Sequence, residues 1–445
     1  MDQDKSFGKF LIVWFGQLLS MTGSGLTGFA LGVYAFERTG MATWATLVTL
    51  LSFVPSILLR PIGGILADRF DRRLVMIVGD LGSAAGIAFI LPFMAAGGPA
   101  LAPVYIGVAI SSIFVGIQNP AYKASATDLL AGEQYSKGSG LVQLAESSRF
   151  LLSPFLAGWI IHRFDYGMVL VIDIATFGLA VLTTLLIRRT MKPARPAGES
   201  GRRLSGLREG WEAIVSNRGV FLLIVMISTV TFFLGFLQTL IGPMALSFTD
   251  ARTLGTIQSV SAFGMLASSL LLGIFSVGRR YADILTAGLI VAGIAFCLLG
   301  TTTDVRIVTA AGFLFLAALP FVNMCCDVLV RSNIPNEKQG RAWGIIGILS
   351  QLGFIVAYGV SGPLADHVFN PLLAEGGPLA STVGRLIGAG PGRGIGLMFV
   401  ICGLLVVVSA VVLSRIRPIR ELAVNAGAGS GAGADAGRRR AGKPV

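Results

Sequence analysis

Charge is the property that this 445-residue chain has least of. Only 13% of its residues are Asp, Glu, Lys or Arg, whereas 54% are hydrophobic, and the mean hydropathy is +0.77. Soluble domains carry roughly 25% charged residues, so the composition excludes an ordinary soluble protein. The chain also has only two histidines, no H-E-x-x-H pattern and no G-x4-G-K-[ST] segment. We therefore expect neither an enzyme nor an ATP-driven pump, and we expect no metal site and no cofactor.

Cysteine is scarce as well. The four cysteines all lie inside apolar segments, at spacings that suit neither a metal site nor a disulfide framework: Cys297, Cys325, Cys326 and Cys402. We interpret them as small buried apolar residues.

Long apolar runs are what the chain has in abundance. A membrane-spanning helix needs about 20 mostly apolar residues. Since lipid admits only helices or closed barrels, we predict an all-α polytopic membrane protein. The first run is too long for a signal-peptide core and is expected to be a retained helix. Twelve spans are predicted, at 10–36, 43–67, 74–97, 103–125, 138–161, 167–187, 219–246, 253–277, 283–301, 306–330, 341–365 and 394–414.

The net charge of +12 follows the predicted topology. When alternate loops are assigned to one side, 27 of the 35 Lys and Arg residues share the side of the N-terminus, six lie opposite and two lie within spans. This bias is the positive-inside rule with both termini in the cytoplasm. The basic charge therefore indicates a lipid bilayer as partner and not a nucleic acid.

The chain divides into two halves around an Arg-, Pro-, Gly- and Ser-rich connection at 188–218. We predict a six-helix bundle over 1–187, a second over 219–414 and a basic, disordered cytoplasmic tail over 415–445. A shift of 204 positions supports a duplication, because it superimposes Asn119 on Asn323, Glu133 on Glu337, Gly140 on Gly344 and Gly158 on Gly362. Parallel half-repeats are typical of alternating-access carriers.

The segment 63–73, GGILADRFDRR, packs two acids and three arginines between two apolar runs. Such charge is costly unless the turn lies at a membrane surface with its charges paired. The spacing Gly64-x3-Asp68-Arg69-x2-Arg72-Arg73 resembles the loop signature of the major facilitator superfamily. Together with GQLLS at 16–20 and ERTG at 37–40, it resembles the drug:proton antiporter branch that includes macrolide-efflux proteins. The resemblance implies twelve helices in two pseudo-symmetric bundles.

In that family the loop holds gating contacts. Carried over, Asp68 would face the N-terminus of the eleventh span, where partial positive charge favours an acid, and Arg72 would pair with Asp128. The alternative is that the charges only anchor the loop and set topology. The second-half counterpart at 273–280 lacks the acid. The resemblance implies as gating residues Gly64, Asp68, Arg69, Arg72, Arg73 and Asp128.

The fifth predicted span carries Gln143, Glu146 and Arg149 along one face. Glu146 and Arg149 would lie roughly 12 and 16 Å from its start, where an unpaired charge costs about 2.5–3.5 kcal/mol. We predict that Glu146 and Arg149 couple transport to protons; a purely structural ion pair is the alternative. The following S-P-x2-A-G at 153–158 resembles a degraded antiporter signature, whose proline and small residues allow a bend and close packing.

Other embedded acids fit a proton site less well. Asp80 and Asp173 are predicted near helix ends on peripheral helices, and Asp327 is expected to pair with Arg279 or Arg280.

The family's central cavity is lined by helices 1, 4, 7 and 10. An apolar, aromatic cavity with few polar groups suits large amphipathic substrates; alternatively, the aromatic residues face lipid or pack between helices. The predicted substrate contacts are Gln17, Ser20, Ser24, Asn119, Phe232, Phe236, Gln238 and Asn323.

The resemblance implies a monomeric secondary transporter in a bacterial inner membrane. It would export drug-like or macrolide-like amphipathic compounds by alternating access, driven by the proton gradient. A siderophore exporter and a lipid-moving carrier are alternatives within the same fold. A non-transporting membrane sensor or scaffold is an alternative of another class.

Overall fold

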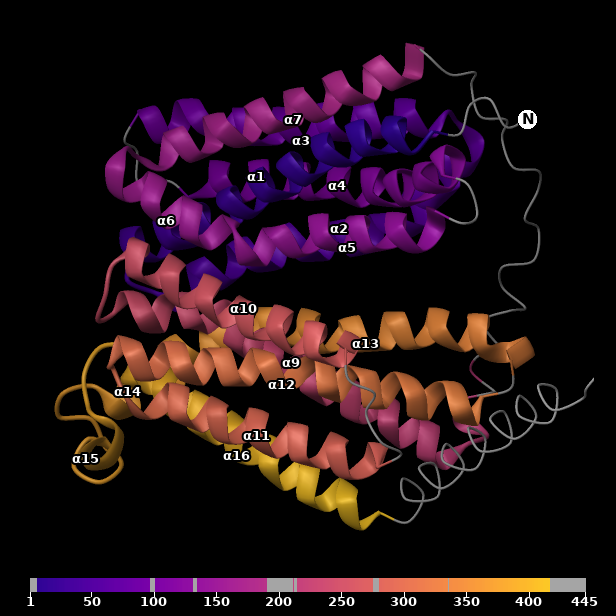
Figure 1. The fold of residues 1–445 in the computed structure, drawn as a ribbon. Coiled ribbons are helices and arrows are strands. Elements are labelled where there is room, and N and C mark those ends of the chain that lie inside the picture. Colours follow the sequence, from indigo (N-terminus) through magenta and orange to yellow (C-terminus); the bar gives the residue numbers. More distant parts are fainter. Residues whose placement is uncertain are drawn as a thin grey trace, which may run out of the picture. The chain divides into compact units, whose positions relative to one another are not determined.

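The computed structural model describes residues 6–96, 101–130, 134–189, 211, 214–274, 280–334 and 336–416. Glu133, Gly278, Arg279 and most of the predicted linker and tail lie outside these ranges. The elements, shown in Figure 1, are α1 (Phe7–Thr39), α2 (Ala42–Arg69), α3 (Arg72–Ala95), α4 (Ala102–Leu129), α5 (Tyr135–Leu151), α6 (Ser153–Arg163), α7 (Tyr166–Arg189), α9 (Arg218–Leu246), α10 (Ala251–Ile274), α11 (Tyr281–Thr301), α12 (Val305–Asn333), α13 (Asn336–Leu364), the π-helical turn η2 (Ala365–Phe369), α14 (Asn370–Leu373), α15 (Gly384–Ile387) and α16 (Arg393–Arg415).

Eleven helices of the described part of the chain are long and apolar enough to cross a membrane. The all-α polytopic fold class is thereby confirmed. The predicted span 138–161 differs, because it is built from two shorter helices, α5 with 17 residues and α6 with 11.

The joint between α5 and α6 lies at Leu152. Pro154 has no backbone N–H and removes one helical hydrogen bond there. The chain stays helical on both sides, since Leu152 N–H donates to the Ser148 carbonyl (2.9 Å) and Leu156 N–H to the Leu152 carbonyl (3.0 Å). The proline thus interrupts the helical hydrogen bonding at one position, between two helices that directly follow one another.

The described chain forms two compact units. The first comprises Met1–Glu199, Thr239–Ser259 and Tyr358–Val368; the second comprises Ser200–Gln238, Val260–Ala357 and Phe369–Val445. These units differ from the predicted bundles, because two short segments of the second half of the sequence group with the first. The bundle boundaries at 187 and 219 stay predictions.

In the first unit, α4 packs against α2 and α3, and α1 packs against α7. The close approach of α2 to α4 depends on glycine. A methyl group added at Gly63 would lie 2.7 Å from the carbonyl oxygen of Ile117, and one added at Gly116 would lie 2.5 Å from that of Ser56. Small residues at helix contacts are the usual means of tight packing in membranes.

In the second unit, α11 packs against α12 and α16. Phe296 of α11 lies at the centre of this contact, with its ring 5.2 Å from that of Phe315 on α12 and 5.0 Å from that of Phe399 on α16. The Phe296 ring thus connects α11 to both α12 and α16.

Candidate functional site

The loop between α2 and α3 is fixed by its own acid, Asp71. The Asp71 carboxylate accepts from the N–H of Arg73 (3.1 Å) and so caps the start of α3. Its other oxygen lies 3.2 Å from Nε of Arg188, in the last turn of α7. Asp71 therefore ties the loop both to α3 and to α7.

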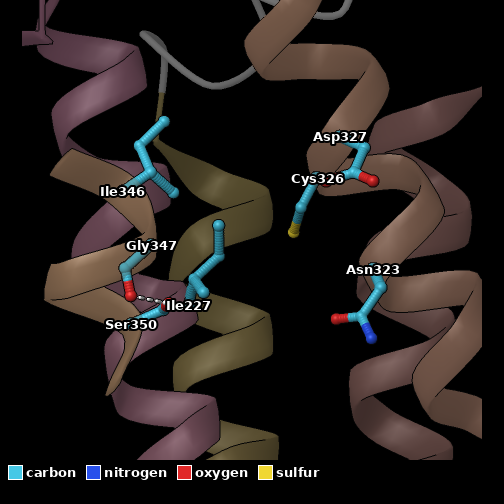
Figure 2. A pocket seen from close by; sticks show the side chains of 7 residues that line it. All are labelled: Ile227, Asn323, Cys326, Asp327, Ile346, Gly347 and Ser350. Carbon is cyan, nitrogen blue, oxygen red and sulfur yellow. Dashed lines mark hydrogen bonds between the residues drawn. The ribbon is translucent and has the colours of Figure 1, made fainter. Parts of the chain in front are cut away.

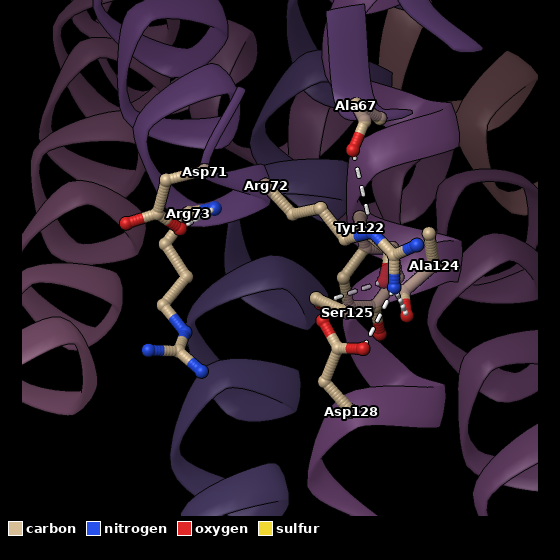
Figure 3. Close-up of polar contacts among 8 residues, drawn as sticks. All are labelled: Ala67, Asp71, Arg72, Arg73, Tyr122, Ala124, Ser125 and Asp128. Atoms are coloured by element: carbon tan, nitrogen blue, oxygen red, sulfur yellow. Dashed lines mark hydrogen bonds and ion pairs between the residues drawn. The ribbon is translucent and has the colours of Figure 1, made fainter. Parts of the chain in front are cut away.

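Arg72 makes the contact that was predicted for it. Nη1 donates to Oδ1 of Asp128 at 2.7 Å and to the carbonyl of Ala124 at 3.1 Å, as Figure 3 shows. The two charged side chains are 19% and 25% exposed. The guanidinium thus joins the first residue of α3 to the last turn of α4, and the gating role of this pair stays a prediction.

The other predicted gating residues occupy different environments. Arg73 is buried at 5% exposure, Asp68 is half-buried and Arg69 is exposed. The approach of Asp68 to the start of the eleventh span stays a prediction. A methyl group added at Gly64 would meet no described atom within 4 Å, so Gly63, which the sequence reading missed, is the residue that permits close packing here.

Glu146 does not form its ion pair with Arg149. Its Oε1 lies 2.7 Å from Nζ of Lys123, so the pair joins α5 to α4. Arg149 is in none of the ion pairs found in the described part of the chain. The alternative of a structural Glu146–Arg149 ion pair is therefore not found there, and proton coupling through these two residues stays a prediction.

Asp80 lies in a buried polar network between α1, α3 and α4. Its carboxylate is 2% exposed and accepts from Nε2 of Gln17 at 3.0 Å, while Oε1 of Gln17 accepts from Nε2 of Gln118 at 2.6 Å. Gln17 is itself 1% exposed and uses both amide atoms in this network. Gln17 thus serves the packing of α1 against α3 and α4, and its predicted contact with substrate stays a prediction.

Asp173 is buried in a similar way. It is 1% exposed, and Oδ2 accepts from the hydroxyl of Thr27 on α1 at 2.6 Å. Oδ1 is buried without a hydrogen-bond partner among the described residues. The sequence reading gave Asp80 and Asp173 little weight because both helices are peripheral; their burial in apolar spans was the signal that it undervalued.

The predicted substrate residues of α1 and α4 are otherwise partly enclosed. Ser20 is 4% exposed, which places it in the helix packing, whereas Ser24 and Asn119 are half-buried. Only the latter two retain surface for a ligand.

The aromatic residues of α9 pack mainly against one another. The Phe232 ring lies 4.8 Å from that of Phe236 and 5.5 Å from that of Phe233. Phe236 is only 5% exposed and packs against Phe232, and its role in substrate contact stays a prediction. Phe232 is half-buried and Gln238 is exposed.

A pocket of about 320 Å³ lies within the second unit, between α9, α12 and α13. Figure 2 shows Asn323 and Asp327 on the wall formed by α12, facing Ile346 and Ser350 of α13. Within the described chain, the Asp327 carboxylate makes no hydrogen bond, and Arg331, one turn along α12, is the charge that acts on it. The pocket's lining is Ile227, Asn323, Cys326, Asp327, Ile346, Gly347 and Ser350.

This pocket contains one predicted substrate residue, Asn323, and one acid that the sequence reading set aside. Its volume falls at the lower end of the range of ligand pockets, about 300–1,000 Å³, and it combines apolar walls with a carboxylate, an amide and a hydroxyl. Such a lining suits part of an amphipathic molecule, with a polar or cationic group directed at Asp327.

Comparison with known proteins finds similarity along most of the chain. Macrolide efflux protein A of Streptococcus pyogenes is 24% identical over 428 residues, which cover 93% of this chain and 97% of that protein. Quinolone resistance protein NorA of Staphylococcus aureus is 21% identical over 392 residues, covering 85% and 96%. The crystal structure of the nucleoside transporter NupG superimposes with a TM-score of 0.67 at 15% identity, over 92% of this chain and all of that one, and shows the fold alone.

The family model described as the Major Facilitator Superfamily matches residues 13–358, most of the chain. The eleven apolar helices, the Arg72–Asp128 loop contact and this match agree with one another. The chain belongs to the Major Facilitator Superfamily, and the protein is a membrane transporter and not an enzyme.

Proposed function

We propose that the protein exports hydrophobic or amphipathic compounds, of drug or macrolide type, by proton antiport with alternating access. The observation that carries this proposal is the similarity to a macrolide efflux protein over 93% of the chain and to a quinolone resistance protein over 85%. The distribution of Lys and Arg favours both termini in the cytoplasm of a bacterial cell, so export runs away from the side of the Arg72 loop. We expect the working unit to be a monomer in the lipid bilayer.

The pocket between α9, α12 and α13 supports an amphipathic substrate. Ile227 and Ile346 offer apolar contact, and Asn323, Ser350 and Asp327 offer polar groups. The Asp327 carboxylate repels an anionic chelator. The pocket therefore favours export of neutral or cationic amphipathic compounds over siderophore export.

The ion pair between α4 and α5 supports proton coupling. A proton on Glu146 would remove the charge that holds Lys123 at 2.7 Å, and the contact between the two helices would weaken. Both side chains are partly exposed, at 31% for Glu146 and 52% for Lys123, so the pair is not sealed inside the helix packing. Asp80 is a second candidate proton site, because Gln17, the hydrogen-bond partner that it has among the described residues, is neutral.

Reconstituted export tests the assignment of the proton site. Glu146→Gln keeps the size of the side chain but cannot exchange a proton, so we expect pH-driven export to be abolished while substrate counterflow continues. Asp80→Asn tests the second site in the same way. Glu375→Gln, at an exposed position, is the control and should behave as wild type. Wild-type pH-driven export by both Glu146→Gln and Asp80→Asn would remove both residues from the proton path.

A further inference from the structure

The start of α2 has no cap from its own neighbourhood. α1 ends at Gly40, whose φ of +68° closes the preceding helix, and α2 begins two residues later at Ala42. The residue at the capping position, Met41, provides no side-chain hydrogen bond. The first N–H groups of a helix have no partner within the helix and need an acceptor from elsewhere.

Asp366 supplies that acceptor from 323 residues away. Its Oδ1 accepts from Ala42 N–H at 3.0 Å, and its Oδ2 accepts from Thr43 N–H at 2.7 Å and from the Thr43 hydroxyl at 2.6 Å. A carboxylate at this end of a helix also gains from the positive end of the helix dipole. We call these three residues, Ala42, Thr43 and Asp366, the Asp366 cap.

The chain around Asp366 is shaped for this contact. Asp366 lies in the π-helical turn η2, which directly follows the end of α13 at Leu364. A methyl group added at Gly362 would lie 2.6 Å from Cα of Thr43, so only glycine lets α13 approach α2 this closely. One turn further back, the Tyr358 ring lies 5.1 Å from the Phe53 ring of α2. Each of these contacts lies inside the first unit, to which Tyr358–Val368 belong.

A second contact in the same unit joins α6 to the start of α10. A methyl group added at Gly158 would lie 2.6 Å from the carbonyl oxygen of Ala251. Phe155 N–H donates to the Ser259 hydroxyl at 3.2 Å. The small residues after Pro154 thus allow the close packing that the sequence predicted. Both contacts join an element of the first sequence half to an element of the second, and the two contacts bring Thr239–Ser259 and Tyr358–Val368 into the first unit.

Alternating access requires that some contacts between the two sequence halves form in one state and break in the other. We propose that Asp366 is a positioning residue for transport, whose carboxylate caps α2 in one state and releases it in the other. The Asp366 cap is suited to release because its donors are at a helix end, where water can replace the carboxylate without breaking the helix. This inference rests on the proposed alternating access and does not depend on the coupling ion or the substrate.

The test uses thiol labelling of a buried reporter. Thr46 of α2 is 1% exposed, and a methyl group added at Gly362 of α13 would clash with its hydroxyl. Thr46→Cys keeps the side chain small and is placed in a chain whose four native cysteines are replaced by alanine. Intact cells are treated with a membrane-impermeant maleimide. The reagent reacts with the introduced thiol only when the end of α13 has separated from the start of α2.

Loss of a helix cap shifts an equilibrium by about 2- to 30-fold. Asn keeps one acceptor oxygen, but its NH2 group cannot accept the two hydrogen bonds that Oδ2 accepts from Thr43. We therefore expect Asp366→Asn to increase the labelling rate by a factor at the lower end of that range, and Asp366→Ala by a larger factor. Thr43→Val keeps the shape of the side chain, removes one of the three hydrogen bonds and should give a smaller increase of the same sign. It also carries the test if Asp366→Asn does not reach the membrane.

Asp165→Asn is the matched control. Asp165 accepts from Met168 N–H at 2.7 Å and so caps α7 within the first sequence half. Its loss should leave the labelling rate unchanged. An unchanged rate in both Asp366→Asn and Thr43→Val would overturn the proposal, and so would an equal increase in Asp165→Asn, because that result would indicate general loosening. Because labelling requires neither substrate nor a proton gradient, a failure here is distinct from a failure of the proposed export.

Discussion

Asp128→Asn tests how strongly the Arg72–Asp128 pair holds the α2–α3 loop to α4. A fully exposed ion pair contributes about 0.2–1 kcal/mol, whereas a hydrogen bond to a charged group contributes about 1.5–3 kcal/mol. The pair is 2.7 Å long and its side chains are 19% and 25% exposed, which is between these cases. We expect a coupling free energy of about 1–2 kcal/mol.

The two partners are not equivalent. Arg72 also donates to the Ala124 carbonyl at 3.1 Å and to the Ala67 carbonyl at 3.4 Å. Arg72→Met therefore removes these bonds as well, and it should cost more than Asp128→Asn, about 2–3 kcal/mol in total. The double variant isolates the pairwise part of the effect, because the carbonyl contacts cancel in the cycle.

The assay is reversible unfolding of the purified protein in detergent, followed by tryptophan fluorescence for the wild type, both single variants and the double variant. Asp165→Asn serves as the control for loss of a carboxylate outside the loop. A coupling below about 0.3 kcal/mol, or equal losses for the two single variants, would refute the reasoning. The Arg72–Asp128 pair would then contribute nothing measurable to the free energy of unfolding.

Two further predictions concern packing and substrate. Gly63→Ala should lower the free energy of unfolding by about 1–3 kcal/mol, because the new methyl group would meet the backbone of α4 at 2.7 Å, whereas Gly64→Ala should change it little. Thermal unfolding of both variants checks this, and equal effects would contradict it. Asp327→Asn should weaken binding of a cationic amphipathic fluorophore about tenfold while leaving a neutral analogue unaffected, as measured by fluorescence titration; an equal loss for both ligands would show that Asp327 does not recognise charge.

Local sequence patterns predicted what local physics determines. The apolar runs gave the helices, because each run can satisfy its backbone only within itself in lipid. The contact between Arg72 and Asp128 was implied by the family resemblance of the charged loop and not by local physics, and the structure contains it. Pro154 predicted the joint between α5 and α6, because a missing N–H acts at its own position.

Tertiary contacts decided what could not be predicted. Helical spacing placed Glu146 and Arg149 on one face, yet Lys123 of α4 comes closer to Glu146 than any charge on its own helix. Gln17 is an amide in an apolar span, and the sequence pattern therefore predicted that it lines a cavity. An amide in an apolar span can equally well bind a buried acid, and Gln17 donates to Asp80. No periodicity connects Asp366 to Thr43, since their contact depends on how α13 approaches α2.

Proton-driven export is tested most directly by measuring substrate uptake into everted vesicles with an imposed pH gradient. A macrolide or a cationic dye is added outside vesicles that contain the protein, with the interior acidic. We expect uptake that collapses when an ionophore dissipates the pH gradient and that returns when the gradient is restored. Uptake that continues at an unchanged rate without any pH gradient would contradict it.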